Sequence, residues 1–324
     1  MNELLVTLFS TPFLFAVIRT STPLVLAALG GLLADLVGAL NVALEGIMLL
    51  GALTGVLVSS VAPWWVAALS AVLAGMLLGG LMALFHLRYK ADVVLVGTAL
   101  NIASAGLTVF LLARATGGDK GSSVNLSSQA IPALDLSGLV GVPWVGPALE
   151  RSLSGHSWLT WFTLLLTALL WFFLYRTAQG LRFRAVGEYA PAAEAAGISA
   201  NVYRGWGLVA SGALAGLAGV QLAMFNYVGF TRDMTAGRGF IALGAVLLGA
   251  RHPVGTALAA LLVGTFEALS VTLPGLFAWI PGELIHSLPF GVTILALVLY
   301  AQRTRRKVRQ RVRKTLRVEA EGGG

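Results

Sequence analysis

The most constraining feature of this sequence is a series of apolar runs long enough to cross a lipid bilayer. Crossing about 30 Å of hydrocarbon takes roughly 20 residues of α-helix. A chain with 57% hydrophobic and only 11% charged residues has too little polar surface for a soluble domain. We therefore expect an all-α, polytopic membrane protein with about eight to ten transmembrane helices. The runs fall near residues 4–18, 22–34, 41–59, 64–87, 93–113, 157–175, 205–229, 239–250, 254–273 and 284–300.

Two places leave the number of crossings open. The first two runs are separated only by Arg19, Thr20 and Ser21, so they predict either one long helix or two short ones. The run 239–250 is too short to cross alone, and we expect it to take part as a broken helix.

Short basic segments indicate which helix ends face the cytoplasm. Arg88 and Lys90, the segment 176–204, and the stretch from Arg303 to Arg317 with nine of the 22 basic residues all belong inside by the positive-inside rule. The segment 114–156, rich in Gly, Ser and Pro, then lies outside. We expect a membrane domain over residues 1–302 and a basic cytoplasmic tail over 303–324 that anchors topology and binds no nucleic acid.

A weak internal repeat is also present. GIMLLGA at Gly46–Ala52 recurs as GAVLLGA at Gly244–Ala250, and the expected topology runs the two copies in opposite directions. Inverted repeats build many transporters around a pathway at their interface. In a chain so rich in Gly, Ala and Leu, a chance match is the competing explanation.

The sequence contains no catalytic or metal-ligand pattern. The four histidines are scattered, and cysteine is absent. GGDKGSS at 117–123 lacks the G-x-x-x-x-G-K-[ST] pattern of a phosphate loop. We therefore expect no enzyme activity, no resident cofactor and no ATP hydrolysis by this chain itself.

Polar residues inside the apolar runs are the candidates for function, because an ionisable group within the bilayer costs a few kcal/mol. Glutamates there predict a pathway or a conformational lock, whereas amides also serve to join helices. The segment 230–240 can line a polar mouth, and nearby aromatic rings can stack on a flat solute. The candidate residues for the pathway or lock are Asn41, Glu45, Asn101, Gln221, Phe225, Asn226, Arg238, Phe240 and Glu267.

One polar stretch, RFRAVGEYAPAAEAAGISANVYR at 182–204, interrupts this apolar chain. Pro191 suits the first turn of a helix and Gly197 is a natural stop, so the stretch predicts a helix of about two turns over 191–196. An isolated helix so short is marginal in water, and it needs something to pack against. A loop helix packed on its own subunit remains the alternative to a docking element.

Four stretches together resemble one known family. In order and spacing, over roughly residues 20–300, they are similar to membrane permease subunits of bacterial ABC importers for nucleosides and simple sugars, in the group that includes ribose and branched-chain amino acid permeases. The nucleoside branch carries these signatures most closely. The stretches are GALNVALEGIMLLGA (38–52), GTALNIASAGLTVFLL (97–112), GLRFRAVGEYAPAAEAAGIS (180–199) and MTAGRGFIALGAVLLGARHPVG (234–255).

Individual residues of this chain match positions in the family's signatures. Where the family has Asn-Pro after the coupling-loop glutamate, this chain has Tyr189 and Ala190, with Pro191 one place later. That departure puts the start of the short helix in doubt. The matching positions are Asn41, Glu45 and Gly46 of an N-x-x-x-E-G signature, Asn101, the T-A-G-R-G-F signature at 235–240, and Glu267.

The resemblance implies partners and a mechanism. A second, related permease subunit, a cytoplasmic ATP-binding subunit with two ATPase domains and an external substrate-binding lipoprotein would complete an importer in the bacterial cytoplasmic membrane. The segment 176–204 would carry the coupling helix that docks on the ATPase. The residues expected to take part in coupling are Arg182, Arg184, Glu188, Pro191, Glu194 and Gly197.

Two other classes of function compete with the importer. An ion-coupled secondary transporter also fits buried glutamates and inverted repeats, but it needs no docking helix and no ATP. A membrane scaffold or intramembrane enzyme is the other alternative, and the lack of paired catalytic residues speaks against the enzyme.

Overall fold

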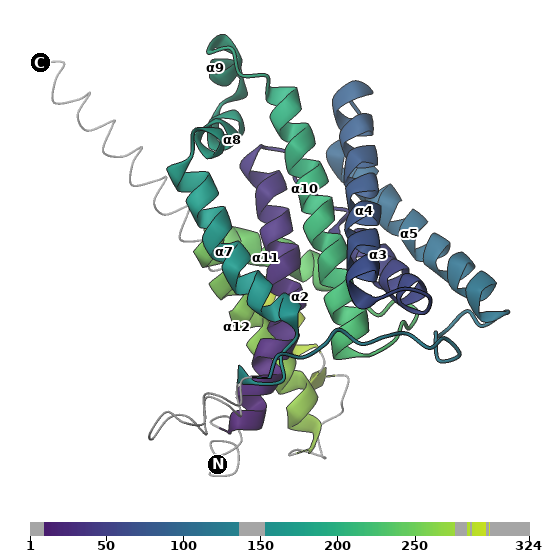
Figure 1. Ribbon diagram of the computed structural model, residues 1–324. Helices are drawn as coiled ribbons and strands as arrows, with labels where there is room; N and C mark the ends of the chain where they lie inside the picture. Colours follow the sequence, from purple (N-terminus) through teal and green to yellow (C-terminus); the bar gives the residue numbers. More distant parts are fainter. Residues whose placement is uncertain (1–9, 136–152, 276–283, 286, 296–297, 299–324) are drawn as a thin grey trace, which may run out of the picture.

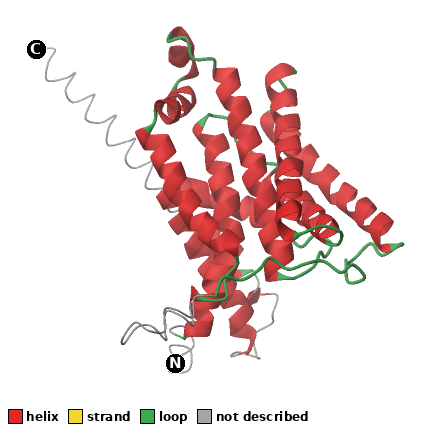
Figure 2. Cartoon of the chain, in the orientation of Figure 1, coloured by secondary structure: helices red, strands yellow, loops and turns green. Residues whose placement is uncertain are grey.

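The computed structural model describes residues 10–135, 153–275, 284–285, 287–295 and 298, and within them the chain is built of helices with only isolated β-bridges (Figure 2). The expected all-α architecture is thus confirmed. The helices, labelled in Figure 1, are α2 (Thr11–Leu36), α3 (Leu44–Ser59), α4 (Trp64–Ala83), α5 (Val93–Thr116), α7 (Trp158–Arg176), α8 (Ala178–Glu188), α9 (Ala190–Ala195), α10 (Ala200–Gln221), α11 (Arg238–Leu248) and α12 (Pro253–Thr272).

Six helices in this part of the chain are long and apolar enough to cross a membrane: α2, α4, α5, α7, α10 and α12. Single π-helical turns, Leu84–Arg88 and Leu222–Asn226, extend α4 and α10. The apolar helices α3 and α11 are shorter, with 16 and 11 residues. A polytopic membrane protein is therefore the right class, although only part of the last expected run, 284–300, is described.

The first two apolar runs merge into the single helix α2, which continues through Pro23. A proline inside a helix has no N–H for the carbonyl four residues earlier, which here belongs to Arg19. The side-chain amide of Asn226 donates to that carbonyl over 3.1 Å. Of the two alternatives left open by the sequence, one long helix is therefore the one observed, and a distant side chain supplies the donor that Pro23 lacks.

Helices α2 and α10 form the centre of the bundle. They pack on one another, α10 packs on α3 and α4, and α2 packs on α11 and α12 (Figure 1). Glycine permits the closest of these crossings. A Cβ at Gly212 of α10 would collide with the backbone carbonyl of Gly75 on α4, and a Cβ at Gly51 of α3 would collide with the backbone of Gly216 on α10. Small residues thus let backbones meet where the bilayer provides little hydrophobic driving force.

The two short helices begin beside one another and run in opposite directions. Gly239 in the first turn of α11 packs against the backbone of Glu45 in the first turn of α3. From there α3 leads to the end of the bundle where α4 begins, whereas α11 leads to the end where α2 finishes and Arg251 meets Asp35. The packed pairs correspond when α2, α3 and α4 are exchanged for α10, α11 and α12. Helix α10 packs on α3 and α4 as α2 packs on α11 and α12, and α3 packs on α4 as α11 packs on α12. This arrangement agrees with the inverted repeat.

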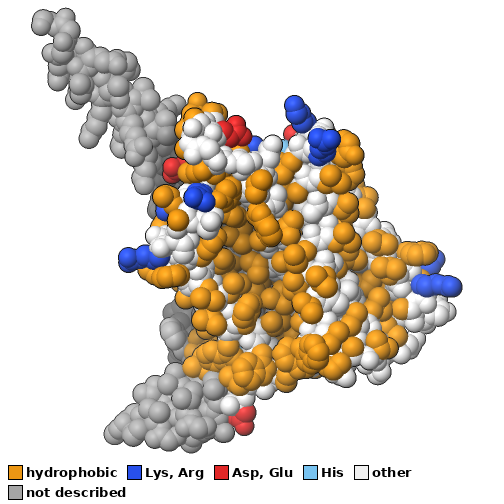
Figure 3. Space-filling view, turned by 45° about the horizontal axis from the view of Figure 1, so that its top comes forward, with side chains coloured by type: hydrophobic (Ala, Val, Ile, Leu, Met, Phe, Trp, Pro, Cys, Tyr) orange, Lys and Arg blue, Asp and Glu red, His pale blue; other side chains and the backbone are white. Residues whose placement is uncertain are grey.

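The basic segments gather at one end of the molecule. Helices α8 and α9 lie at that end, opposite the connection that follows α5 (Figure 1). In Figure 3 hydrophobic side chains cover the side of the bundle, and Lys and Arg side chains lie at its upper end and at its left and right edges. This distribution fits the expected orientation; the tail 303–324 lies outside the described residues.

The segment GGDKGSS forms a closed turn. The carboxylate of Asp119 accepts hydrogen bonds from the backbone N–H groups of Gly121 and Ser122, over 2.7 and 3.2 Å. These bonds lower the pKa of Asp119 below its ordinary value. An anion would need the same amides, so the turn does not act as a phosphate loop.

We expect cysteines placed at the two ends of the bundle to label from opposite sides. Val124 is 85% exposed in the connection after α5, and Ala195 is exposed on α9. The chain has no native cysteine, so each variant, Val124→Cys or Ala195→Cys, carries one thiol. An impermeant maleimide added to intact cells should react with the first and reach the second only after permeabilisation. Ser123, next to Val124, is buried and serves as the unreactive control; the reverse labelling pattern would invert the topology.

Candidate functional site

The carboxylate of Glu45 caps the first turn of α11. Its Oε1 accepts from the N–H of Gly237 over 2.7 Å, and its Oε2 accepts from the N–H of Gly239 over 2.6 Å. Gly237 has a φ of +81°, which favours glycine, and any side chain at Gly239 would overlap the backbone of Glu45. Because the first N–H groups of a helix have no partner within it and carry partial positive charge, a carboxylate is well suited to this position.

Two amides, of which Asn41 is buried and Asn101 partly buried, hold the start of α3 in a similar way. Asn101 of α5 accepts from the N–H of Gly46 over 2.7 Å and donates to the carbonyl of Val42 over 2.9 Å. Asn41 accepts from the N–H of Ala43 and donates to the hydroxyl of Ser211 on α10, over 3.0 and 2.9 Å. Both amides therefore lock the connection between α2 and α3 to the helices around it.

Arg238 and Glu267 form a largely buried ion pair that joins α11 to α12. The Nε of Arg238 donates to Oε1 of Glu267 over 2.7 Å, and the two side chains are only 14% and 11% exposed. The guanidinium also donates to the hydroxyl of Tyr227 and to the carbonyl of Met234, over 3.2 and 3.0 Å. Within the described residues, Oε2 of Glu267 is buried without a hydrogen-bond partner. The pair thus fixes the first turn of α11 and keeps one acceptor uncommitted.

A second group of candidates lies at the end of α10. Arg19 of α2 donates to the carbonyls of Phe225 and Asn226, and its guanidinium lies 5.7 Å from the centre of the Phe225 ring. Gln221 accepts from the hydroxyl of Ser157 over 2.8 Å. These contacts fasten the end of α10 to α2 and to the start of α7, so this cluster is separate from the one around α11.

The structure therefore divides the predicted residues into two groups. Glu45, Arg238 and Glu267 meet at the first turn of α11, with Phe240 half-exposed on the same helix. The other residues join helices. Sequence reasoning missed Tyr227 as a partner of Arg238, and it noted Arg19 only as a separator, although a lone arginine in an apolar run was the available signal. Among the described residues no cluster of His, Asp or Glu could hold a metal ion.

The segment 176–204, which is expected to couple the chain to an ATPase and is named the coupling segment for that reason, contains the two short helices α8 and α9. The sequence predicted one helix over 191–196, and α9 occupies Ala190–Ala195, within one residue of it despite the shifted proline. Gly197 has a φ of +78°, and the N–H of Ile198 closes the end by donating to the carbonyl of Ala193. The preceding residues form a second helix, α8, which was not predicted from the sequence.

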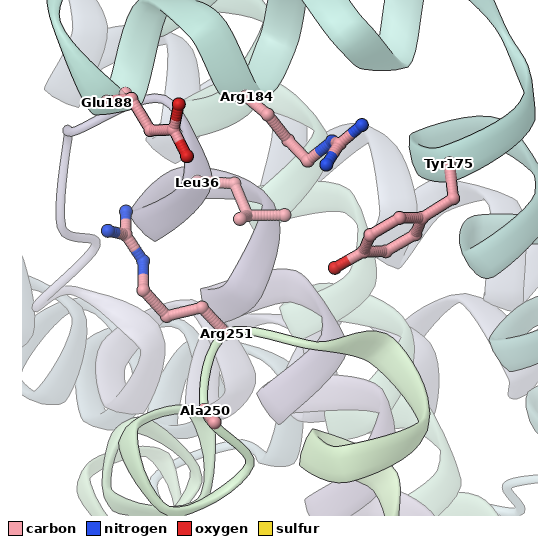
Figure 4. Close-up of a pocket in the computed structure, with 7 residues that line it drawn as sticks. Leu36, Tyr175, Arg184, Glu188, Ala250 and Arg251 are labelled. Atoms are coloured by element: carbon pink, nitrogen blue, oxygen red, sulfur yellow. The ribbon is translucent and has the colours of Figure 1, made fainter.

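The residues expected to take part in coupling differ in how far they are available to a partner. On α9, Pro191 and Glu194 are exposed, as are Arg182 and Glu188 on α8. Arg184 instead faces its own subunit: its Nε donates to the carbonyl of Leu174 over 3.1 Å, and its guanidinium stacks 4.4 Å from the Tyr175 ring centre (Figure 4). Arg184 thus secures α8 on α7.

The chain matches one protein family over residues 13–298, the family described as branched-chain amino acid transport system / permease component. No solved structure matches the chain.

Curated relatives cover most of the chain. It is 33% identical to the nucleoside ABC transporter permease protein NupC of Lactococcus lactis, over 86% of this chain and 89% of that protein. Identity to the guanosine ABC transporter permease protein NupQ of Bacillus subtilis is also 33%, over 86% and 88%. A putative glucose ABC transporter permease protein of Haloferax volcanii, TsgC13, is 32% identical over 81% of this chain and 78% of its own length.

Replacing the capping carboxylate tests the role of the α11 start. In Glu45→Gln one amide oxygen remains, so one of the two N–H groups of α11 loses its acceptor, at a cost of about 1–3 kcal/mol. We expect solute uptake by reconstituted vesicles to fall strongly, with the amount of chain in the membrane unchanged. Asp233→Asn, which removes an exposed carboxylate, is the matched control. Normal uptake by Glu45→Gln would reduce Glu45 to a dispensable contact.

Proposed function

The chain belongs to the family of ABC transporter permease components, and we propose that with a second, related permease it encloses the pathway of an importer for a nucleoside. A permease of this family is not an enzyme, since ATP is hydrolysed by a separate ATPase subunit. Its apolar helices make it a multi-pass protein of the bacterial cytoplasmic membrane. The ion-coupled alternative finds no support in the family or in the relatives.

The observation that carries the proposal is the polar cluster at the first turn of α11. Two carboxylates and one guanidinium are assembled inside an otherwise apolar bundle, and ionisable groups at such depth mark solute pathways or the elements that gate them. Glu45 and the pair of Arg238 with Glu267 act as the lock that holds α11. Phe240, which is half-exposed on α11, offers a flat apolar face to the solute.

A nucleoside fits the chemistry of these residues and the names of the relatives. Its base is a flat ring that stacks on aromatic side chains, and its ribose hydroxyls donate to a carboxylate. Two of the relatives are named for nucleosides or guanosine, whereas one is named for glucose. A simple sugar is therefore the second candidate solute, and the arms of the uptake experiment separate the two.

The remaining partners belong to this proposal as well. An external substrate-binding lipoprotein would deliver the solute at the end where the connection after α5 lies. A subunit with two ATPase domains would bind at the opposite end, against α9 and the exposed side chains of Arg182 and Glu188. The small, exposed surface of α9 permits close approach to a groove in that subunit.

Uptake into proteoliposomes tests the function. The chain is reconstituted with its partner subunits, the binding protein outside and ATP inside, and offered labelled guanosine, adenosine, uridine, ribose or glucose. We expect ATP-dependent accumulation of a nucleoside that persists when ionophores collapse ion gradients. Accumulation of glucose or ribose alone would assign a sugar instead. Uptake that needs no ATP and is abolished by ionophores would contradict the importer.

A charge reversal on α9 tests the docking face. Glu194 is exposed, so Glu194→Lys should leave the fold intact but place a like charge against basic residues of the ATPase. We expect co-purification of the ATPase to weaken about tenfold, which corresponds to about 1.4 kcal/mol. Asp233→Lys, the same change on the opposite end of the molecule, is the control. Equal recovery of ATPase with both variants would remove α9 from the interface.

A further inference from the structure

A cavity of about 240 Å³ lies where the coupling segment meets the membrane helices (Figure 4). Its walls come from the ends of α2 and α7, from α8, and from the turn between α11 and α12. Arg251, in that turn, belongs neither to the polar cluster at the start of α11 nor to the residues expected to take part in coupling. The cavity is thus the place where four elements with different roles come together.

Helix α8 is pressed directly onto the end of α2. A Cβ at Gly187 would collide with the carbonyl oxygen of Leu36, so only glycine allows this contact. Arg184 fastens the same helix to α7 through the carbonyl of Leu174. Since interiors packed this tightly transmit displacement rather than absorb it, a movement of α8 also moves the end of α2.

The end of α2 is tied in turn to α11. Asp35, next to Leu36, pairs with Arg251: the Nε to Oδ2 distance is 2.7 Å, and Nη2 of Arg251 donates to the backbone carbonyl of Asp35. Arg251 follows α11 by three residues. One guanidinium therefore binds both the side chain and the backbone of Asp35, a two-point attachment that lysine cannot reproduce.

The turn that carries Arg251 needs such an attachment. Ala250 and Arg251 both have positive φ, +54° and +60°, a conformation that L residues with side chains avoid. A backbone in this region persists when its surroundings enforce it. The bonds to Asp35, together with the close packing of Gly249 on Thr256, hold the turn in place.

Helix α11 is consequently held at both ends by carboxylates of the N-terminal half: Glu45 at its start and Asp35, through Arg251, after its end. Glu188 extends toward Arg251 from the opposite wall of the cavity (Figure 4), and within the described residues it forms no ion pair. The acidic surroundings of Arg251 thus come from both α2 and the coupling segment.

We infer that Arg251 is the positioning residue through which movement of the coupling segment reaches α11 and the polar cluster at its start. This inference rests on the proposed function, since it needs an ATPase that moves α8 and α9. The route runs from α8 through Gly187 to the end of α2, and from Asp35 through Arg251 to α11. Arg251 touches no solute; it acts by keeping α11 attached to the moving end of α2.

The test compares solute transport with ATP consumption in the reconstituted complex. Arg251→Gln should assemble with the ATPase and hydrolyse ATP, but the amount of labelled guanosine imported per ATP should fall at least tenfold. Arg251→Lys should fall in between. The double reversal Asp35→Arg with Arg251→Asp should recover part of the ratio, because it restores the pair. Arg114→Gln, which removes an exposed guanidinium from the last turn of α5, should leave the ratio unchanged.

A second measurement needs no transported solute. With a single thiol introduced by Phe240→Cys, maleimide labelling should change severalfold when ATP and vanadate are added, and this change should disappear in combination with Arg251→Gln. A retained change, or an import ratio equal to wild type, would overturn the role of Arg251. Wild-type complex that responds to ATP in labelling but imports no nucleoside would instead refute the proposed function and leave this inference standing.

Discussion

Helices α3 and α11 begin inside the bundle, and the N–H groups of their first turns need hydrogen-bond acceptors there. The architecture depends on which residues supply these acceptors. A bilayer offers no water for the purpose. Asn101 of α5 serves the start of α3, and Glu45, which is itself in that start, serves α11. Arg238 of α11 then pairs with Glu267 of α12. A continuous line of polar contacts therefore joins α5, α3, α11 and α12 through the apolar interior.

This line explains why the first turn of α11 contains so much glycine. Gly237 supplies the left-handed backbone at the cap, and Gly239 admits the backbone of Glu45. Either glycine replaced by alanine would separate the carboxylate from the N–H groups that it binds. The T-A-G-R-G-F signature thus has a geometric explanation. Its two glycines let a carboxylate approach the helix start, and the arginine between them reaches the next helix.

Much of the fold followed from the sequence because it depends on local patterns. The apolar runs, the shortness of α11, and the position of α9 with its stop at Gly197 are set by hydropathy, proline and glycine within a few residues. The remote partnerships were not predictable. Asn226 satisfies a carbonyl freed by Pro23, some 200 residues earlier, and Arg184 donates to the carbonyl of Leu174 in its own subunit. In each case the residue type allowed several roles, and only its neighbours in space decide between them.

The packing of α2 also bears on how the protein is made. Its principal contacts are with α10, α11 and α12, which are synthesised more than 160 residues after it, whereas it hardly touches α3. Until those helices leave the ribosome, the carbonyl of Arg19 and the carboxylates of Asp35 and Glu45 have none of the partners described above. These polar groups of the N-terminal half therefore lack partners in the membrane while the rest of the chain is synthesised. During that time a chaperone or the insertion machinery can bind them.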